Sequence, residues 1–200
     1  MGSGGLSITA SVPALGRESE LAALTGVLDG ARHGTGGALV VRGEPGVGKS
    51  LLLATVTHGA GDLTVLSATG VQSESDLAFG ALSALLRPLL DGIDRLPAVQ
   101  ADSLRAAVGL AAAAQVEPLP CHAAVVGLLA AAAAERSVLV VADDLQWFDA
   151  ASRDAVLFAA RRMGSDAVAF VMAVRDGESE EPLRTGLPEL RLSGLAEEPA

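Results

Sequence analysis

GEPGVGKS, residues 43–50, decides the fold, because it satisfies the spacing G-x-x-x-x-G-K-[ST] of a phosphate-binding loop. Its glycines permit backbone conformations that side chains disfavour, so that successive N–H groups can turn inward toward phosphate oxygens. Lys49 is expected to bridge the terminal phosphates, and the Ser50 hydroxyl to coordinate Mg²⁺. The predicted nucleotide-binding residues of this stretch are Gly43, Glu44, Pro45, Gly46, Val47, Gly48, Lys49, Ser50 and Leu51.

The segments on either side of this loop have the required order of strand, loop and helix. The apolar run 38–41 leads into the loop, and LLLATVTHGA at 51–60 continues with a helix-compatible pattern. That helix would add the positive end of its dipole to the phosphate site. Lys49 is also the only lysine in the chain. A phosphate loop is therefore a better interpretation than a glycine turn with an incidental lysine.

Apolar strands alternate with helical patterns along the rest of the chain. Leucines and valines at helical spacing predict a first helix from Glu18 to the break at HGTGG, 33–37. Further strands are expected at 63–68, 137–144, 167–174 and in ELRLSG, 189–194. Further helices are expected near 82–90, 98–114, 121–135 and 151–163. The pattern predicts an α/β fold, a P-loop NTPase three-layer sandwich with a mainly parallel five-stranded sheet flanked by helices.

Two carboxylates end the predicted strand 137–144. Asp143 is expected to hold Mg²⁺, acting through a water, and Asp144 to orient the attacking water. Hydrolytic relatives often have glutamate at the second position. Because aspartate is one methylene shorter, slow hydrolysis is expected. The alternative is that the two acids cap the helix that follows.

Arg175 directly follows the strand 167–174, so it should emerge at the same sheet edge as Asp143. It is either a sensor of the γ-phosphate, and so part of the catalytic set with Lys49 and Asp144, or a solvated arginine. Gln146 and Trp147 either line the site or, for the tryptophan, pack the junction between strand and helix.

Composition argues against several classes of function and location for this chain. The formal net charge of -10 argues against direct DNA binding by this chain, since nucleic-acid affinity depends on Lys and Arg at phosphates. The apolar run 123–134 is shorter than the roughly 18 residues of a membrane span, which predicts a buried helix and no membrane insertion. The N-terminus lacks a secretory signal and Cys121 is the single cysteine, so a cytoplasmic location is expected. Cys121 and the histidines 33, 58 and 122 show no metal-ligand spacing.

Five segments resemble one known family: LGRESEL (15–21), VVRGEPGVGKSLLL (40–53), SDLAFGALSALLRPLL (75–90), VVADDLQWFDAAS (140–152) and AVRD (173–176). Together they are similar to the N-terminal ATPase domain of large ATP-binding LuxR-type transcriptional regulators, in the STAND branch of AAA-like P-loop proteins. ATP is favoured over GTP independently, because the guanine-reading Asn-Lys-x-Asp motif needs a second lysine.

The resemblance implies more than the residues show by themselves. It places Gly16 and Arg17, in the Gly-Arg-x-x-Glu segment that ends at Glu20, near the adenine or ribose. It implies a switch with an ADP-bound resting form, an ATP-bound form competent to self-associate, and a distant DNA-binding domain. The expected organisation is a flexible leader (1–13), an ATPase domain (14–195) and the start of a lid or a tail (196–200). Because such regulators continue past the position of Ala200, the chain is either a fragment or a short relative whose output lies in a partner.

Three functions are compatible with these motifs. The leading hypothesis is an ATP/ADP-binding regulatory module with weak Mg²⁺-dependent ATPase activity. A P-loop kinase or phosphotransferase acting on a small molecule is the second, although an arginine-rich lid is expected there and DGESEE at 176–181 offers carboxylates, which also suit a solvated loop. The third is a scaffold that binds nucleotide without turnover.

Overall fold

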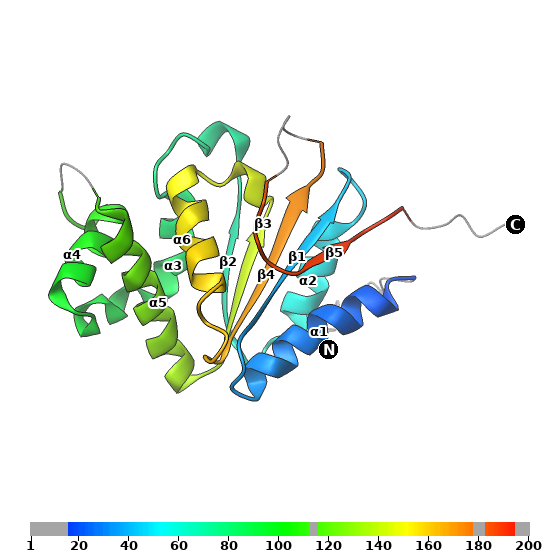
Figure 1. The fold of residues 1–200 in the computed structure, drawn as a ribbon, viewed down its shortest axis with the longest axis horizontal. Coiled ribbons are helices and arrows are strands. Elements are labelled where there is room, and N and C mark those ends of the chain that lie inside the picture. The colour runs from blue at the N-terminus through cyan, green and yellow to red at the C-terminus, as the bar shows by residue number, and fades with distance from the viewer. Residues whose placement is uncertain (1–15, 113–115, 178–182, 195–200) are drawn as a thin grey trace, which may run out of the picture.

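Five parallel strands form the central sheet, in the spatial order β2-β3-β4-β1-β5 (Figure 1). The computed structural model describes residues 16–112, 116–177 and 183–194. The strands are β1 (Gly37–Gly43), β2 (Thr64–Thr69), β3 (Val138–Asp143), β4 (Val168–Arg175) and β5 (Glu189–Arg191). Since all pairs are parallel, their carboxyl ends meet at one edge of the sheet.

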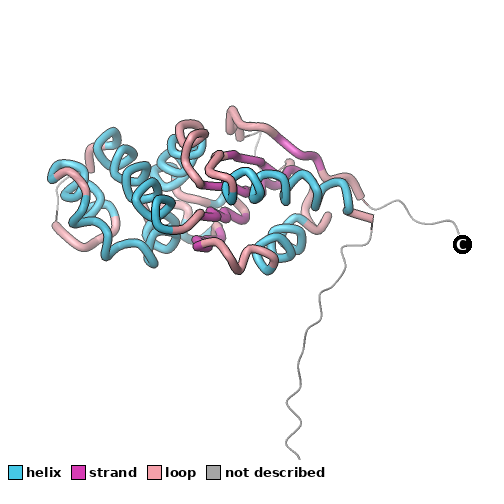
Figure 2. Tube along the Cα trace, turned by 90° about the horizontal axis from the view of Figure 1, so that it is seen from below, coloured by secondary structure: helices cyan, strands magenta, loops and turns pink. Residues whose placement is uncertain are grey.

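Helices cover both faces of the sheet, as Figures 1 and 2 show. One face carries α1 (Glu18–Arg32) and α2 (Lys49–His58). The other carries α3 (Gly80–Leu86), α5 (Pro118–Glu135) and α6 (Ala150–Ala160), with α4 (Ala98–Ala107) packed outside α5. Short 3₁₀ helices complete the set: η1 (Gln72–Glu74), η2 (Arg87–Arg95) and η3 (Leu145–Trp147).

Each face of the sheet has its own hydrophobic core. Leu24 and Leu28 of α1 and Leu52 of α2 pack on one face of the strands, and alternate strand residues belong to this core. The larger core on the other face joins the remaining strand residues to α3, η2, α4, α5 and α6. Strands β3 and β4 are buried along almost their whole length because both faces are covered.

The predicted α/β three-layer architecture is therefore confirmed, with the five strands near their predicted positions. Two helices differ. The α-helix expected over 82–90 ends at Leu86 and continues as η2, because Pro88 has no N–H to donate to the preceding turn. The helix expected to reach 114 ends at Ala107, ahead of Gly109 at a φ of 77°. The proposed leader and tail, 1–13 and 196–200, lie outside the described residues.

Helix α5 contributes to the core from one side. Among the described residues it is the one helix long and apolar enough to cross a membrane by length and composition. Its buried residues are Cys121, Ala124, Val125, Leu128 and Leu129, and it packs between α4 and α6. One side of α5 thus belongs to the core, but only 28 % of the helix is buried, which is less than the buried helix expected from the sequence.

Asp149 joins the beginnings of α3 and α6. As the N-cap of α6 it accepts a hydrogen bond from the Ser152 N–H at 2.9 Å. Its carboxylate also accepts the N–H groups of Phe79 at 2.8 Å and Ala81 at 3.3 Å, while the Ser152 hydroxyl accepts the N–H of Leu82 at 2.8 Å. Burial alone would raise the pKa of Asp149, but these hydrogen bonds outweigh it and hold that pKa below its ordinary value.

We predict that Asp149→Ala lowers the free energy of unfolding by about 3 kcal/mol, since it removes a cap and leaves buried N–H groups without partners. Asp154→Ala, at an exposed position of the same helix, should change it by less than about 0.5 kcal/mol. Urea denaturation measures both. Because the folded pKa is lowered, the contribution of Asp149 is complete above the ordinary carboxyl pKa of about 4 and is lost as the pH falls through the folded value. A difference from wild type that stayed constant down to acidic pH would contradict this account.

Candidate functional site

The loop 43–50 connects β1 to α2, and its lysine donates hydrogen bonds back to the start of the loop. Gly48 has a φ of 101°, in the left-handed region that side chains disfavour, and it precedes the first residue of the helix. The Lys49 ammonium donates to the carbonyl oxygens of Gly43 at 2.9 Å and Glu44 at 2.8 Å. Lys49 is only 5 % exposed, so its charge is fixed beneath the loop.

Helix α2 begins at this loop and is anchored in the core on its inner side. Leu52, Leu53 and Val56 are buried, whereas Ser50 and Leu51 in the first turn are exposed. The unpaired N–H groups of the first helical turn and the positive end of the helix dipole therefore lie at the loop. Gly43 is buried, and Glu44, Pro45 and Gly46 are exposed, so the tip of the loop is open to a ligand.

Strand register brings the other predicted residues to the same edge. Gly43 at the end of β1 is paired with Arg175 at the end of β4. Asp143 at the end of β3 is paired with Thr69 at the end of β2, and β3 itself is paired with β4. The structure thus brings the loop, the acidic pair and Arg175 together, as the parallel sheet predicts.

Asp144 and Arg175 form a two-pronged ion pair between the ends of β3 and β4. The Nε and Nη2 atoms of Arg175 lie 2.7 and 2.6 Å from the two carboxylate oxygens of Asp144. Gln146 spans the same gap: its amide donates to Asp144 at 3.0 Å, and its carbonyl oxygen accepts the Arg175 backbone N–H at 3.1 Å. Arg175 is therefore not simply a solvated strand-end residue, and Gln146 belongs to the site.

The electrostatics of these groups are linked. Burial alone would raise the pKa of Asp144, but hydrogen bonds from Arg175 and Gln146 hold it below the ordinary value. Burial lowers the pKa of Lys49, and Arg175 lowers it further, while the carboxylates of Asp144, Asp176 and Asp143 act in the opposite direction. The charge of Lys49 is therefore coupled to Arg175 and to these three acids.

Asp143 and Asp144 do not cap the helix that follows, because Asp149 has that position. A carboxylate oxygen of Asp143 accepts the Asp144 backbone N–H at 2.9 Å, and Asp144 has a φ of 50° with no side-chain capping bond. The Ser50 hydroxyl and the Asp143 carboxylate are oxygen donors of the kind that Mg²⁺ prefers. This donor set fits a magnesium ion held jointly with nucleotide phosphates.

The turn that carries Asp144 rests on a glycine. A Cβ atom on Gly70, just after β2, would lie 2.3 Å from the Asp144 carbonyl oxygen and 3.0 Å from the Trp147 Cβ. The Gly70 N–H also donates to the Asp143 carbonyl at 2.9 Å. Trp147 is half-buried at this junction, in agreement with the packing alternative.

Arg17 links the loop to the segment after β5, and both of these line a cleft beside the loop. Its guanidinium donates to the Val47 carbonyl at 3.3 Å and the Ser193 carbonyl at 2.6 Å, and it pairs with Glu20 at 2.9 Å. The cleft has a volume of about 1000 Å³ and is lined by the loop residues 43–47, Asp176 and residues 191–194. Gly16 precedes this contact at a φ of 79°.

Arg42 is a residue that the sequence analysis missed. It is 4 % exposed, one position before the loop, and its Nε lies 2.8 Å from Glu189 of β5. Its other nitrogens reach Asp176, at 3.9 Å, and the Leu183 carbonyl. Asp176 also pairs with Arg191 at 3.5 Å, so its carboxylate is not simply solvated, and residues 178–181 of the predicted solvated loop lie outside the described residues. The sequence feature that could have identified Arg42 is an arginine inside an otherwise apolar strand.

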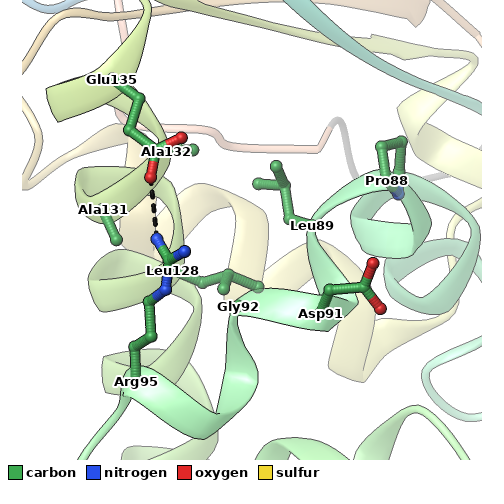
Figure 3. A pocket seen from close by; sticks show the side chains of 9 residues that line it. All are labelled: Pro88, Leu89, Asp91, Gly92, Arg95, Leu128, Ala131, Ala132 and Glu135. Carbon is green, nitrogen blue, oxygen red and sulfur yellow. Dashed lines mark hydrogen bonds and ion pairs between the residues drawn. The ribbon is translucent and has the colours of Figure 1, made fainter.

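A second, smaller hollow lies between η2 and α5 (Figure 3). It has a volume of about 180 Å³ and a mainly apolar lining that includes Leu89, Leu128 and Ala132. The ion pair of Arg95 with Glu135, at 2.8 Å, closes one side. None of the predicted site residues lies in this hollow.

Comparison with known proteins identifies the class. Residues 13–171 match the AAA ATPase domain family. The chain belongs to this family, and it is a nucleotide-binding P-loop domain. No curated protein sequence matches it.

One solved structure supports the fold. ORC2 from Aeropyrum pernix, solved in ADPNP-ADP complexes, matches with a TM-score of 0.51 and 19 % identity, over 89 % of this chain and 48 % of that one. Two further matches have lower TM-scores. One is a chain of the HORMA:CdnC:Trip13 complex from E. coli MS115-1, with a TM-score of 0.49 and 13 % identity, over 89 % of this chain and 62 % of that one. The other is PCH-2 from C. elegans, with a TM-score of 0.46 and 12 % identity, over 89 % and 43 %. The chain thus spans about half the length of ORC2.

We predict that Gly70→Ala displaces the turn 144–147 and lowers the free energy of unfolding by about 1–3 kcal/mol. Gly61→Ala is the matched control on the other side of β2, because a Cβ there meets nothing within 4 Å. Denaturation with Trp147 emission as the probe compares the two. Equal stability and equal emission in both variants would show that the close approach does not constrain the turn.

Proposed function

We propose that this domain is the ATP/ADP-binding switch module of a LuxR-type transcriptional regulator, with slow Mg²⁺-dependent hydrolysis of ATP to ADP. The proposal joins the AAA ATPase family membership to the resemblance carried by the five sequence segments. The observation that carries it is the ion pair of Asp144 with Arg175 next to the phosphate loop. An acid and an arginine at this position are suited to distinguishing a triphosphate from a diphosphate.

The loop would bind the phosphates in this scheme. Lys49 would exchange the loop carbonyls for the β- and γ-phosphate oxygens, and the N–H groups at the start of α2 would donate to phosphate oxygens. Ser50 and Asp143 would hold Mg²⁺, which when bound neutralises phosphate charge. Asp144 would orient the attacking water, and Arg175 would contact the terminal phosphate.

The cleft beside the loop would hold the nucleoside. Gly16 and Arg17 lie next to it, because Arg17 contacts two of its lining residues, Val47 and Ser193. We propose a cytoplasmic protein whose ATP-bound form self-associates. With a net charge of -10, this domain would leave DNA binding to another part of the regulator.

Lys49→Ala tests the nucleotide site. We expect the dissociation constants of ATP and ADP to rise by at least about tenfold, since a charged hydrogen-bond donor to phosphate is lost. Isothermal titration calorimetry measures both, with circular dichroism to establish that the variant is folded. A folded variant with wild-type affinity would refute the site.

Asp144→Asn tests hydrolysis. We expect turnover to fall by about a hundredfold, the scale of a lost general base, while the protein still binds ATP. Phosphate release under saturating Mg-ATP measures it. Unchanged turnover would remove the role given to Asp144, and ADP formation that required an added small-molecule acceptor would favour a phosphotransferase instead.

A further inference from the structure

Both carboxylate oxygens of Asp144 accept a hydrogen bond from the Arg175 guanidinium. The two N–H···O contacts, at 2.6 and 2.7 Å, are in the range of strong charge-assisted hydrogen bonds. The Asp144 side chain is 13 % exposed and that of Arg175 36 % exposed. The acid is thus largely enclosed, whereas the arginine is partly exposed.

The pair is aligned from several sides. Gln146 holds one Asp144 oxygen and the Arg175 backbone at once. The turn after Asp144 is closed by the Trp147 N–H on the Asp144 carbonyl, at 2.8 Å, and rests against Gly70. Asp144 itself has a φ of 50°, which a non-glycine residue rarely adopts. Such a conformation needs support from its surroundings, and the ion pair is part of that support.

A phosphate bound at the loop would be an alternative partner for the Arg175 guanidinium. The backbone of Arg175 lies opposite Gly43, the first residue of the phosphate loop, in the pairing of β4 with β1. Guanidinium groups bind phosphate through the same two-pronged geometry that they use for carboxylate. A terminal phosphate above the loop would therefore compete directly with Asp144, whereas a diphosphate would place no phosphate there.

We propose that the Asp144–Arg175 pair, aligned by Gln146, is a latch that the terminal phosphate of a nucleoside triphosphate opens by drawing the guanidinium away from Asp144. This inference rests on the proposed function. Opening has two consequences: it frees the Asp144 carboxylate to orient water, and it removes one constraint from the turn that carries Trp147. Hydrolysis and signalling would thereby depend on the same contact.

A double-mutant cycle on nucleotide preference tests the latch. The measured quantity is the dissociation constant of Mg-ADP divided by that of a non-hydrolysable Mg-ATP analogue. Asp144→Asn keeps one acceptor but loses the charge, so we expect it to raise this ratio by about tenfold. Arg175→Ala should lower the ratio below the wild-type value. Arg175→Lys keeps the positive charge but loses the two-pronged geometry of the guanidinium, so its ratio should lie between those of Arg175→Ala and the wild type.

The double variant separates the latch from simple charge repulsion. If Asp144 acts by holding Arg175, Asp144→Asn has no further effect once Arg175 is alanine. If the carboxylate only repels the triphosphate, the same increase appears in both backgrounds, and the latch is overturned. Asp62→Asn is the matched control, since Asp62 forms the same two-pronged pair with Arg32, at 2.7 and 2.8 Å, before the start of β2. That variant should leave the ratio unchanged.

Trp147 gives a second readout that does not depend on turnover. It is the only tryptophan in the chain, so intrinsic emission reports on the turn after Asp144. We expect the ATP analogue and ADP to give different emission spectra in the wild type and the same spectrum in Arg175→Ala. Equal spectra in the wild type would overturn the latch while leaving nucleotide binding intact. Failure of the wild type to bind either nucleotide would overturn the proposed function as well.

Discussion

The pairing of β1 with β4 is the contact on which the site depends. It runs from Gly37 opposite Ala169 to Gly43 opposite Arg175. The Asp176 N–H then donates to the Gly43 carbonyl at 3.1 Å, which continues the pairing past the end of the strands. A shift of the register by one residue would turn every side chain of β1 to the opposite face. It would also separate the phosphate loop from Arg175, so the packing of both cores fixes the chemistry at the edge.

The fold was predictable because its signals are local and repeated. Apolar runs without alternation mark strands covered on both faces, and the glycine loop fixes the junction of β1 with α2. The parallel sheet then requires Asp143 and Arg175 to meet at one edge. The wrong prediction of the helix end before η2 also has a local cause. The helix ends early because of Pro88, and the leucine pattern at 82–90 does not show this effect.

The polar contacts within the site were not predictable from sequence. Asp144 was assigned to water and Arg175 to phosphate, but nothing in the residue order indicates that they bind each other. The role of Asp149 was hidden for the same reason, since its partners Phe79 and Ala81 are distant in sequence. Such pairings depend on distances between side chains across neighbouring elements, and a periodic pattern carries no information about them.

Buried charge in this domain is satisfied by the protein itself. Lys49 donates to two loop carbonyls, and Arg17 donates to the Val47 and Ser193 carbonyls. Arg42 donates to the Leu183 carbonyl and pairs with Glu189 of β5. Each buried side-chain nitrogen or oxygen in the described part of the chain has a hydrogen-bond partner. When a nucleotide binds, its phosphate oxygens must replace internal oxygens as hydrogen-bond acceptors. The net free energy of binding is therefore the difference between two sets of strong contacts. In the proposed switch this difference would be small compared with either set, so that one additional phosphate would change which set prevails.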